Sequence, residues 1–138
     1  SQKPSEETVI LVAHGPSPDD ENKKWLADMA SLADQIKRSS RFRDIRFMTV
    51  RDDAEPAIRN QATAELRQLI KSVKAENRKA LVVPLLLSYG GIERGIKKRL
   101  EGLDYITTNQ ALLPDPLLAE WVLTSAREAL RDSKSAQK

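Results

Sequence analysis

The stretch Val9-Ile10-Leu11-Val12-Ala13-His14-Gly15-Pro16 decides how this chain of 138 residues folds. Its apolar run ends at a glycine and a proline, a pattern typical of a buried strand in a parallel sheet. His14 therefore lies at the carboxyl end of that strand. In open α/β sheets the crevice beyond these strand ends is where ligands bind, and an imidazole there can ligate a metal or move a proton. A hydrogen bond within the loop is the alternative role for the same side chain.

Downstream of His14, helical and strand patterns alternate along the chain. The spacing of apolar residues and the helix-starting and helix-ending residues predict four helices, over 19–38, 56–77, 93–101 and from Asp115-Pro116 onward. Further strands are expected over 44–50, 80–87 and 105–108. Pro84 is unfavourable in the third strand, because proline has no N–H to donate to a β-ladder and usually marks an irregular or edge position.

Three of these helices carry apolar faces that we expect to be buried. On the second helix that face comprises Ile58, Ala62, Leu66, Leu69, Ile70 and Val73. Asp19 and Asp20 open the first helix with an N-cap and negative charge, and Asn77 and Gly102 are expected to close the second and third helices. The residues predicted to face inward are Trp25, Met29, Leu32, Ala33 and Ile36 on the first helix, and Leu118, Trp121, Val122 and Leu130 on the last.

Strands that alternate with helices need right-handed crossovers, which favours a four-stranded parallel sheet in the order 2-1-3-4 with helices on both faces. We therefore predict one α/β domain over residues 1–138, with flexible ends at 1–7 and 132–138. The strand order reverses between the first and third strands. This switch point places His14 across a crevice from the segment that follows the third strand.

That segment reads Ser88-Tyr89-Gly90-Gly91-Ile92-Glu93. The glycine pair lets the backbone approach a ligand, and the N-terminus of the following helix suits a carboxylate or phosphate. Glu93 is the predicted partner of His14. The alternatives are a turn that needs glycine for steric reasons, and a Glu93 that complements the helix dipole.

Composition excludes several kinds of site. Without cysteine the chain has no disulfides, no thiolate catalysis and no cysteine-ligated zinc, so any metal must be held by nitrogen and oxygen ligands. A net charge of +3 with 4% aromatic residues gives little support to nucleic-acid binding. The densest basic cluster could instead attract an anionic small molecule; it comprises Arg94, Lys97, Lys98 and Arg99.

The chain also carries no sign of a membrane segment. No apolar stretch approaches the roughly 20 residues that span a bilayer, and the first residues are polar rather than a signal sequence. We expect a cytoplasmic protein. Because the sequence begins with Ser1, a trimmed form that has lost an export signal stays an open alternative.

At this point the chain resembles the CbiX-type sirohydrochlorin chelatases, the short members of the class II tetrapyrrole chelatase superfamily. The resemblance rests on three segments: Val9 to Gly15, Val82 to Gly90 and Leu113 to Leu118. It implies a flavodoxin-like lobe that inserts Co²⁺, or in relatives Fe²⁺ or Ni²⁺, into a tetrapyrrole of cobalamin or related biosynthesis. The divalent metal is then a substrate, and no organic cofactor is expected.

The resemblance also implies roles for single residues. His14 matches the family histidine that ligates the metal and accepts a proton. A second family histidine has no match; the corresponding stretch reads Gly91-Ile92-Glu93-Arg94, and Glu93 is the nearest possible ligand. The acidic residue that the family has after its second strand has no clear match either. Three carboxylates lie in that loop and are more readily explained as loop charges and N-cap residues: Asp52, Asp53 and Glu55.

The substrate implied by the resemblance carries many carboxylates around its rim. Arg51, Arg94 and Lys97 suit them, together with the segment Ser88-Tyr89-Gly90-Gly91, and Tyr89 is a candidate to stack on the macrocycle. One lobe offers only one wall for a flat ring, so we expect a homodimer, as the resemblance also implies. The competing hypothesis is a tetrapyrrole or metal-ion carrier that has lost its second histidine and does not catalyse insertion.

Overall fold

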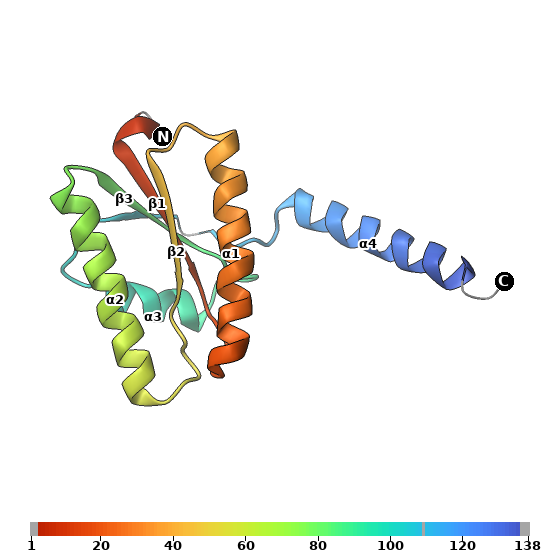
Figure 1. Ribbon diagram of the computed structural model, residues 1–138, viewed down its shortest axis with the longest axis horizontal. Helices are drawn as coiled ribbons and strands as arrows, with labels where there is room; N and C mark the ends of the chain where they lie inside the picture. Colours follow the sequence, from red (N-terminus) through yellow and green to blue (C-terminus); the bar gives the residue numbers. More distant parts are fainter. Residues whose placement is uncertain (1–2, 109, 136–138) are drawn as a thin grey trace.

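A computed structural model describes residues 3–108 and 110–135 of the chain. After a short 3-10 helix, η1 (Pro4–Glu6), strands and helices alternate (Figure 1). In chain order they are β1 (Glu7–Ala13), α1 (Asp19–Ser39), β2 (Asp44–Thr49), α2 (Pro56–Ala75), β3 (Lys79–Pro84), α3 (Gly91–Arg99), β4 (Ile106–Thr107) and α4 (Pro116–Ser135). Regular structure thus extends into both predicted flexible ends; residues 1, 2 and 136–138 lie outside the described part.

The sheet is parallel throughout, and its order, β2-β1-β3-β4, confirms the predicted topology. β1 lies in its interior, and every residue of β1 is buried, as its continuous apolar run predicts. Pro84 ends β3 opposite Val12, whereas β4 pairs with β3 only at Leu81 and Val82. The missing N–H of Pro84 therefore interrupts no ladder on the β4 side.

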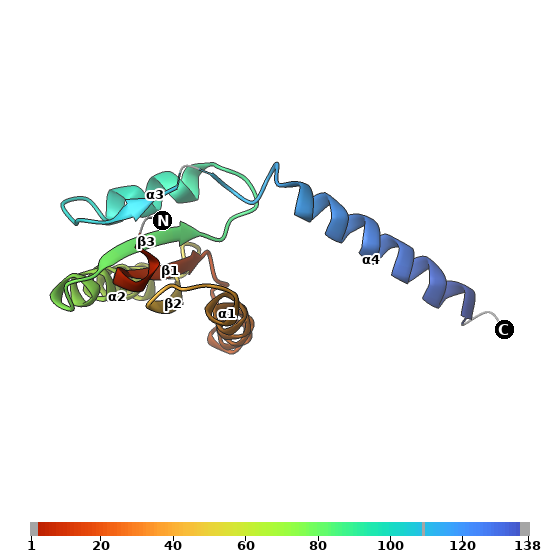
Figure 2. The same cartoon turned by 90° about the horizontal axis from the view of Figure 1, so that it is seen from above.

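The two faces of the sheet are covered unequally. One face packs against α2 and α3 in a core that includes Ile10, Val82, Leu66 and Ile96. The other face packs against α1, whose Met29 and Ala33 meet Val9, Leu11 and Ala13. Figure 2 shows α3 and α1 on opposite sides of the strands. Helices therefore lie on both faces, as expected.

The predicted helix ends fall at or near residues whose conformation explains them. Pro56 is the first residue of α2, where its missing N–H costs no helical bond. Asn77 and Gly102 follow α2 and α3 with φ of 56° and 79°, the left-handed conformation that stops a helix. α3 starts two residues before the predicted Glu93, at Gly91.

Trp25 and Leu32 do not lie in the core, which corrects the prediction for α1. Trp25 is 45% exposed. The buried stripe of α1 runs instead through Asn22, Met29 and Ala33, joined by Leu26 and Ile36 at its margins. One residue turns a helix by about 100°, so Trp25 lies beside this stripe rather than on it.

α4 also differs from its prediction. It leads away from the sheet in both views (Figures 1 and 2). Its apolar residues are exposed rather than inward: Trp121 by 65%, Val122 by 52%, and Leu117, Leu123 and Leu130 by more than half. The periodicity correctly predicted a helix with an apolar face, but no part of the described lobe covers that face.

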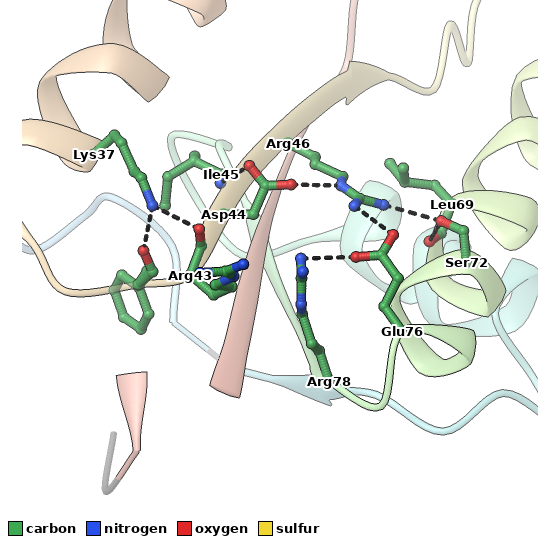
Figure 3. Close-up of polar contacts among 10 residues, drawn as sticks. Lys37, Arg43, Asp44, Ile45, Arg46, Leu69, Ser72, Glu76 and Arg78 are labelled. Carbon is green, nitrogen blue, oxygen red and sulfur yellow. Dashed lines mark hydrogen bonds and ion pairs between the residues drawn. The ribbon is translucent and has the colours of Figure 1, made fainter. Parts of the chain in front are cut away.

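A charge network at the amino end of β2 ties this edge strand to α2 (Figure 3). The Arg46 guanidinium contacts the Asp44 carboxylate at 2.9 Å, the Ser72 hydroxyl at 3.0 Å and the Glu76 carboxylate at 2.8 Å. Arg78 contacts the other oxygen of Glu76 at 2.7 Å. The network lies at the end of the sheet opposite His14, so we assign it a structural role.

The hydrogen bond from Arg46 holds the pKa of the Glu76 carboxyl below its usual value. A depressed carboxyl pKa contributes stability that is present above the unfolded-state pKa and is lost as the pH falls through the folded-state pKa. Arg46→Met should therefore lower the unfolding temperature at pH 7, and its difference from the parent should shrink as the pH falls below about 4.5. Thermal unfolding at several pH values tests this, with Arg41→Met as a control on an exposed arginine. An equal difference at pH 7 and pH 3 would contradict it.

Candidate functional site

His14 lies directly after β1, in a loop that is held firmly against the end of β2. The His14 carbonyl accepts a hydrogen bond from the Arg51 N–H at 2.7 Å, and the Ala13 carbonyl accepts one from Val50 at 2.9 Å. Gly15 has a φ of 75°, and a Cβ built there would lie 2.4 Å from the Cβ of Thr49. The close approach of these two segments requires glycine at position 15. The backbone around the imidazole is therefore fixed.

Arg51 reinforces this loop. Its guanidinium contacts the Asp19 carboxylate at 2.7 Å and also donates to the Ser17 carbonyl. The Thr49 hydroxyl donates to the buried side chain of Asn22 at 2.8 Å, joining the end of β2 to α1. Arg51 was expected to receive an acidic substrate group, but its side chain is largely buried in these contacts. Its observed role is to hold the loop that carries His14.

The carboxylate that contacts His14 belongs to Asp53. Its Oδ2 lies 3.3 Å from Nε2 of the imidazole, in the loop between β2 and α2. The His14 side chain is 24% exposed and that of Asp53 is 76% exposed, so solvent reaches both members of the pair. This differs from the prediction that Glu93 is the partner of His14. The pair combines one nitrogen and one oxygen donor, both of which suit a divalent transition metal.

The neighbouring carboxylates of the same loop have different surroundings. Asp52 pairs with the guanidinium of Arg99 on α3, which also reaches the Val50 carbonyl at 3.3 Å. Burial lowers the pKa of Arg99. Glu55 occupies the N-cap position of α2 without a side-chain capping bond. Asp53 is thus the acidic residue of this loop that lies against the imidazole.

Glu93 is buried, with 3% of its surface exposed, in the first turn of α3. Its Oε2 accepts a hydrogen bond from the Gly90 N–H at 2.6 Å. This agrees with the alternative role weighed for Glu93, a negative residue at a helix N-terminus. Its Oε1, however, is buried and finds no hydrogen-bond partner among the residues that the structure describes. Burying a carboxylate oxygen without a donor lowers the stability of the folded state.

The loop between β3 and α3 borders two hollows. One has a volume of about 310 Å³ and is lined by Leu86, Leu87, Ser88, Gly90, Gly91, Ile92 and Glu93. The other, of about 350 Å³, lies between Tyr89 and the segment before α4. Tyr89 is exposed, and its hydroxyl lies 3.2 Å from Nζ of Lys97. Arg94 is exposed one residue beyond Glu93.

The predicted site residues therefore fall into two groups at the carboxyl edge of the sheet. His14 and Arg51 belong to the β1–β2 side, whereas Ser88, Tyr89, Gly90, Gly91, Glu93 and Arg94 belong to the β3–α3 loop. The sequence analysis explained Asp53 as a loop or N-cap residue, whereas the structure places it against His14. Its position directly after the second strand was the signal that could have identified it. Within residues 3–108 and 110–135, no group of three or more His, Cys, Asp or Glu side chains is arranged to hold a metal.

The parallel sheet carries a histidine–carboxylate pair and a helix that begins at a glycine at its switch point, which is where open α/β sheets bind ligands. The chain belongs to the CbiX family, whose model matches residues 8–129. The match covers almost the whole lobe and all residues of the candidate site. Searches of curated proteins and of solved structures gave no match.

Membership of the family supports a role as a tetrapyrrole metal chelatase, which takes a divalent metal as substrate. Among the described residues, no helix is long and apolar enough to cross a bilayer. The fold, the family and the general class of chemistry thus agree.

Proposed function

We propose that this protein inserts Co²⁺ into a sirohydrochlorin-type tetrapyrrole, with His14 as the residue that receives the metal. The observation that carries the proposal is the contact of 3.3 Å between Nε2 of His14 and Oδ2 of Asp53, at the switch point of a CbiX-family lobe. Imidazole nitrogen and carboxylate oxygen are ligands that Co²⁺ accepts while it keeps exchangeable water.

Insertion requires that a divalent ion replace two protons on the ring nitrogens, so each turnover releases two protons. A group near the ring must accept them as the metal enters. His14 and Asp53 form one candidate acceptor, and the unpaired Oε1 of Glu93 forms another. We assign metal delivery to the His14–Asp53 pair and proton acceptance to Glu93. The carboxylates of Asp53 and Glu93 and the imidazole of His14 then share metal binding and proton acceptance.

The tetrapyrrole rim is expected to contact the basic and glycine-rich part of the same edge. Arg94 and Lys97 supply positive charge on α3, and the exposed Tyr89 lies against Lys97. Arg51 is assigned to the loop rather than to the substrate, because its guanidinium already contacts Asp19 and Ser17. We further propose that a homodimer supplies the second wall that a flat macrocycle needs.

The experiment that tests this function is a turnover assay. Purified protein, sirohydrochlorin and Co²⁺ should give the metallated product, followed by absorbance, faster than the uncatalysed mixture. Parallel assays with Fe²⁺ and Ni²⁺ rank the metals. The same assay with Asp53→Asn should run at least roughly 10-fold slower, because a neutral amide is a weaker oxygen ligand than the carboxylate that faces His14. The control is Asp34→Asn, an exposed carboxylate on α1.

A non-catalytic carrier is the second candidate, and one observation favours it. The described residues offer the metal a two-residue site rather than a cluster of three ligands. Such a protein would bind Co²⁺ or the tetrapyrrole stoichiometrically without accelerating insertion. Binding without turnover would select the carrier and reject the chelatase.

A further inference from the structure

Arg99 is the last residue of α3, and its side chain contacts the loop between β2 and α2 instead of solvent. The side chain is 16% exposed. Its guanidinium contacts the Asp52 carboxylate and donates to the Val50 carbonyl at 3.3 Å. A buried guanidinium needs such acceptors, because it has lost the water that would otherwise bind it. Both acceptors belong to the three residues that precede Asp53.

The end of α3 that carries Arg99 is itself held firmly on the lobe. Ile96 and Leu100 are buried in the core, with 3% and 0% of their surface exposed. Arg67 of α2 donates to the carbonyl of Arg99 at 2.6 Å and to that of Glu101 at 3.1 Å. Carbonyls at the C-terminus of a helix have no partner within the helix, so these bonds fix that end. The guanidinium of Arg99 therefore reaches the loop from a rigid base.

The loop between β2 and α2 makes a tight turn whose two central residues are Asp52 and Asp53. The Ala54 N–H donates to the Arg51 carbonyl at 3.1 Å, which closes the turn. The Asp52 side chain is 22% exposed, whereas that of Asp53 is 76% exposed. Among the described residues, His14 provides the one polar contact of the Asp53 side chain. The direction of this carboxylate therefore depends on how the turn itself is held.

We infer that Arg99 is a positioning residue, which holds Asp52 on the side of α3 and thereby directs Asp53 toward His14. Without Arg99, the free Asp52 carboxylate becomes a second possible partner of the imidazole, beside a neighbour of the same charge. Glu93 lies in the first turn of the same helix, so α3 fixes both carboxylates to which we assign a role. The effect of Arg99 on metal binding rests on the proposed function, whereas its effect on the direction of Asp53 does not.

Substitutions of Arg99 test this role through the affinity for Co²⁺, measured by calorimetric titration well below the unfolding temperature of each variant. Arg99→Met should lower the affinity by about 10-fold, the lower end of what loss of a group that orients a metal ligand costs. Arg99→Lys keeps the charge but not the planar fork that reaches two acceptors, so it should retain part of the affinity. Lys98→Met removes an exposed cation one residue away and is the matched control, with the affinity of the parent.

A double variant shows whether Arg99 acts through Asp52. Adding Asp52→Asn to Arg99→Met should lower the Co²⁺ affinity no further, because the contact between the two side chains is already lost. Thermal unfolding of each variant reports separately on the stability that the buried pair contributes. Parent affinity for Co²⁺ in both single variants of Arg99, together with a lower unfolding temperature, would reduce Arg99 to a structural residue and overturn the inference.

A second measurement needs neither metal nor tetrapyrrole. His14 is the only histidine in the sequence, so the imidazole resonances in the nuclear magnetic resonance spectrum report on its surroundings alone. At constant pH, Arg99→Met should move these resonances toward those of Asp53→Asn, and Lys98→Met should leave them at the parent position. Resonances that Arg99→Met leaves unchanged would overturn the inference, even in an active chelatase. Unchanged Co²⁺ affinity in His14→Ala would instead reject the proposed function, while the resonances still decide the direction of Asp53.

Discussion

His14→Ala should abolish Co²⁺ binding at the carboxyl edge of the sheet, with affinity lowered by at least about 100-fold, and should stop metal insertion. His14 is the only histidine in the sequence, so no second imidazole can replace it. The fold should survive, because the loop is held by backbone bonds to Val50 and Arg51 rather than by the imidazole. Calorimetric titration with Co²⁺ measures the affinity, and thermal unfolding measures the fold.

The single histidine also gives a spectroscopic readout of its own. Imidazole resonances in the nuclear magnetic resonance spectrum belong to His14 alone, and paramagnetic Co²⁺ should shift or broaden them at stoichiometric concentration. His14→Gln is the polar control, since it keeps hydrogen-bonding capacity without a nitrogen ligand. Unchanged Co²⁺ affinity in the alanine variant, or imidazole resonances insensitive to Co²⁺, would remove His14 from the metal site.

The order of the sheet could be predicted because each element carries its own signals. These signals are local features of the chain. They are the apolar run before His14, Pro56 at the start of α2, and the residues with left-handed conformation that end helices, Asn77 and Gly102. Right-handed crossovers then leave few ways to arrange four parallel strands. The switch point, and with it the edge that holds the candidate site, follows from this arrangement.

The sequence did not identify Asp53 as the carboxylate that contacts His14. The sequence presents three similar carboxylates after β2, at positions 52, 53 and 55. What separates them is Arg99, which approaches from α3 and engages Asp52, leaving Asp53 against the imidazole. A contact between residues 47 positions apart has no local signature in the chain. The loop could be predicted, but the acidic residue that faces His14 could not.

α4 illustrates a second limit. Periodicity reports that a helix has an apolar face, and the prediction assigned that face to the core of the same chain. The direction of α4 instead depends on hydrogen bonds between Leu112 and Leu113 and the segment after β3. Periodicity carries no information about where the helix lies relative to the sheet. Trp121 was therefore assigned to the interior of its own lobe, whereas the structure leaves it exposed.

Glu93→Gln should slow metal insertion by roughly 10- to 100-fold while leaving the unfolding temperature unchanged or higher. The glutamine carbonyl can still accept the Gly90 N–H, so the helix cap survives, but the negative charge is gone. In the parent protein the buried Oε1 of Glu93 has no donor within the described part of the chain, an arrangement that costs stability. A role for Oε1 as a proton acceptor during metal insertion would explain why the protein keeps this destabilising group.

Comparison of two substitutions separates this role from capping alone. Glu93→Ala removes both the cap and the acceptor, so it should lower stability as well as the insertion rate. Glu93→His introduces the histidine that the resemblance to the chelatases implies, and insertion retained by that variant would support a site for metal or protons at this position. If Glu93 acts only as a cap, Glu93→Gln should insert metal at the parent rate and Glu93→Ala should lose stability alone. Rates measured at saturating tetrapyrrole, beside unfolding temperatures, distinguish the two cases. A parent-like rate in the glutamine variant would leave His14 and Asp53 as the residues on which the chemistry depends.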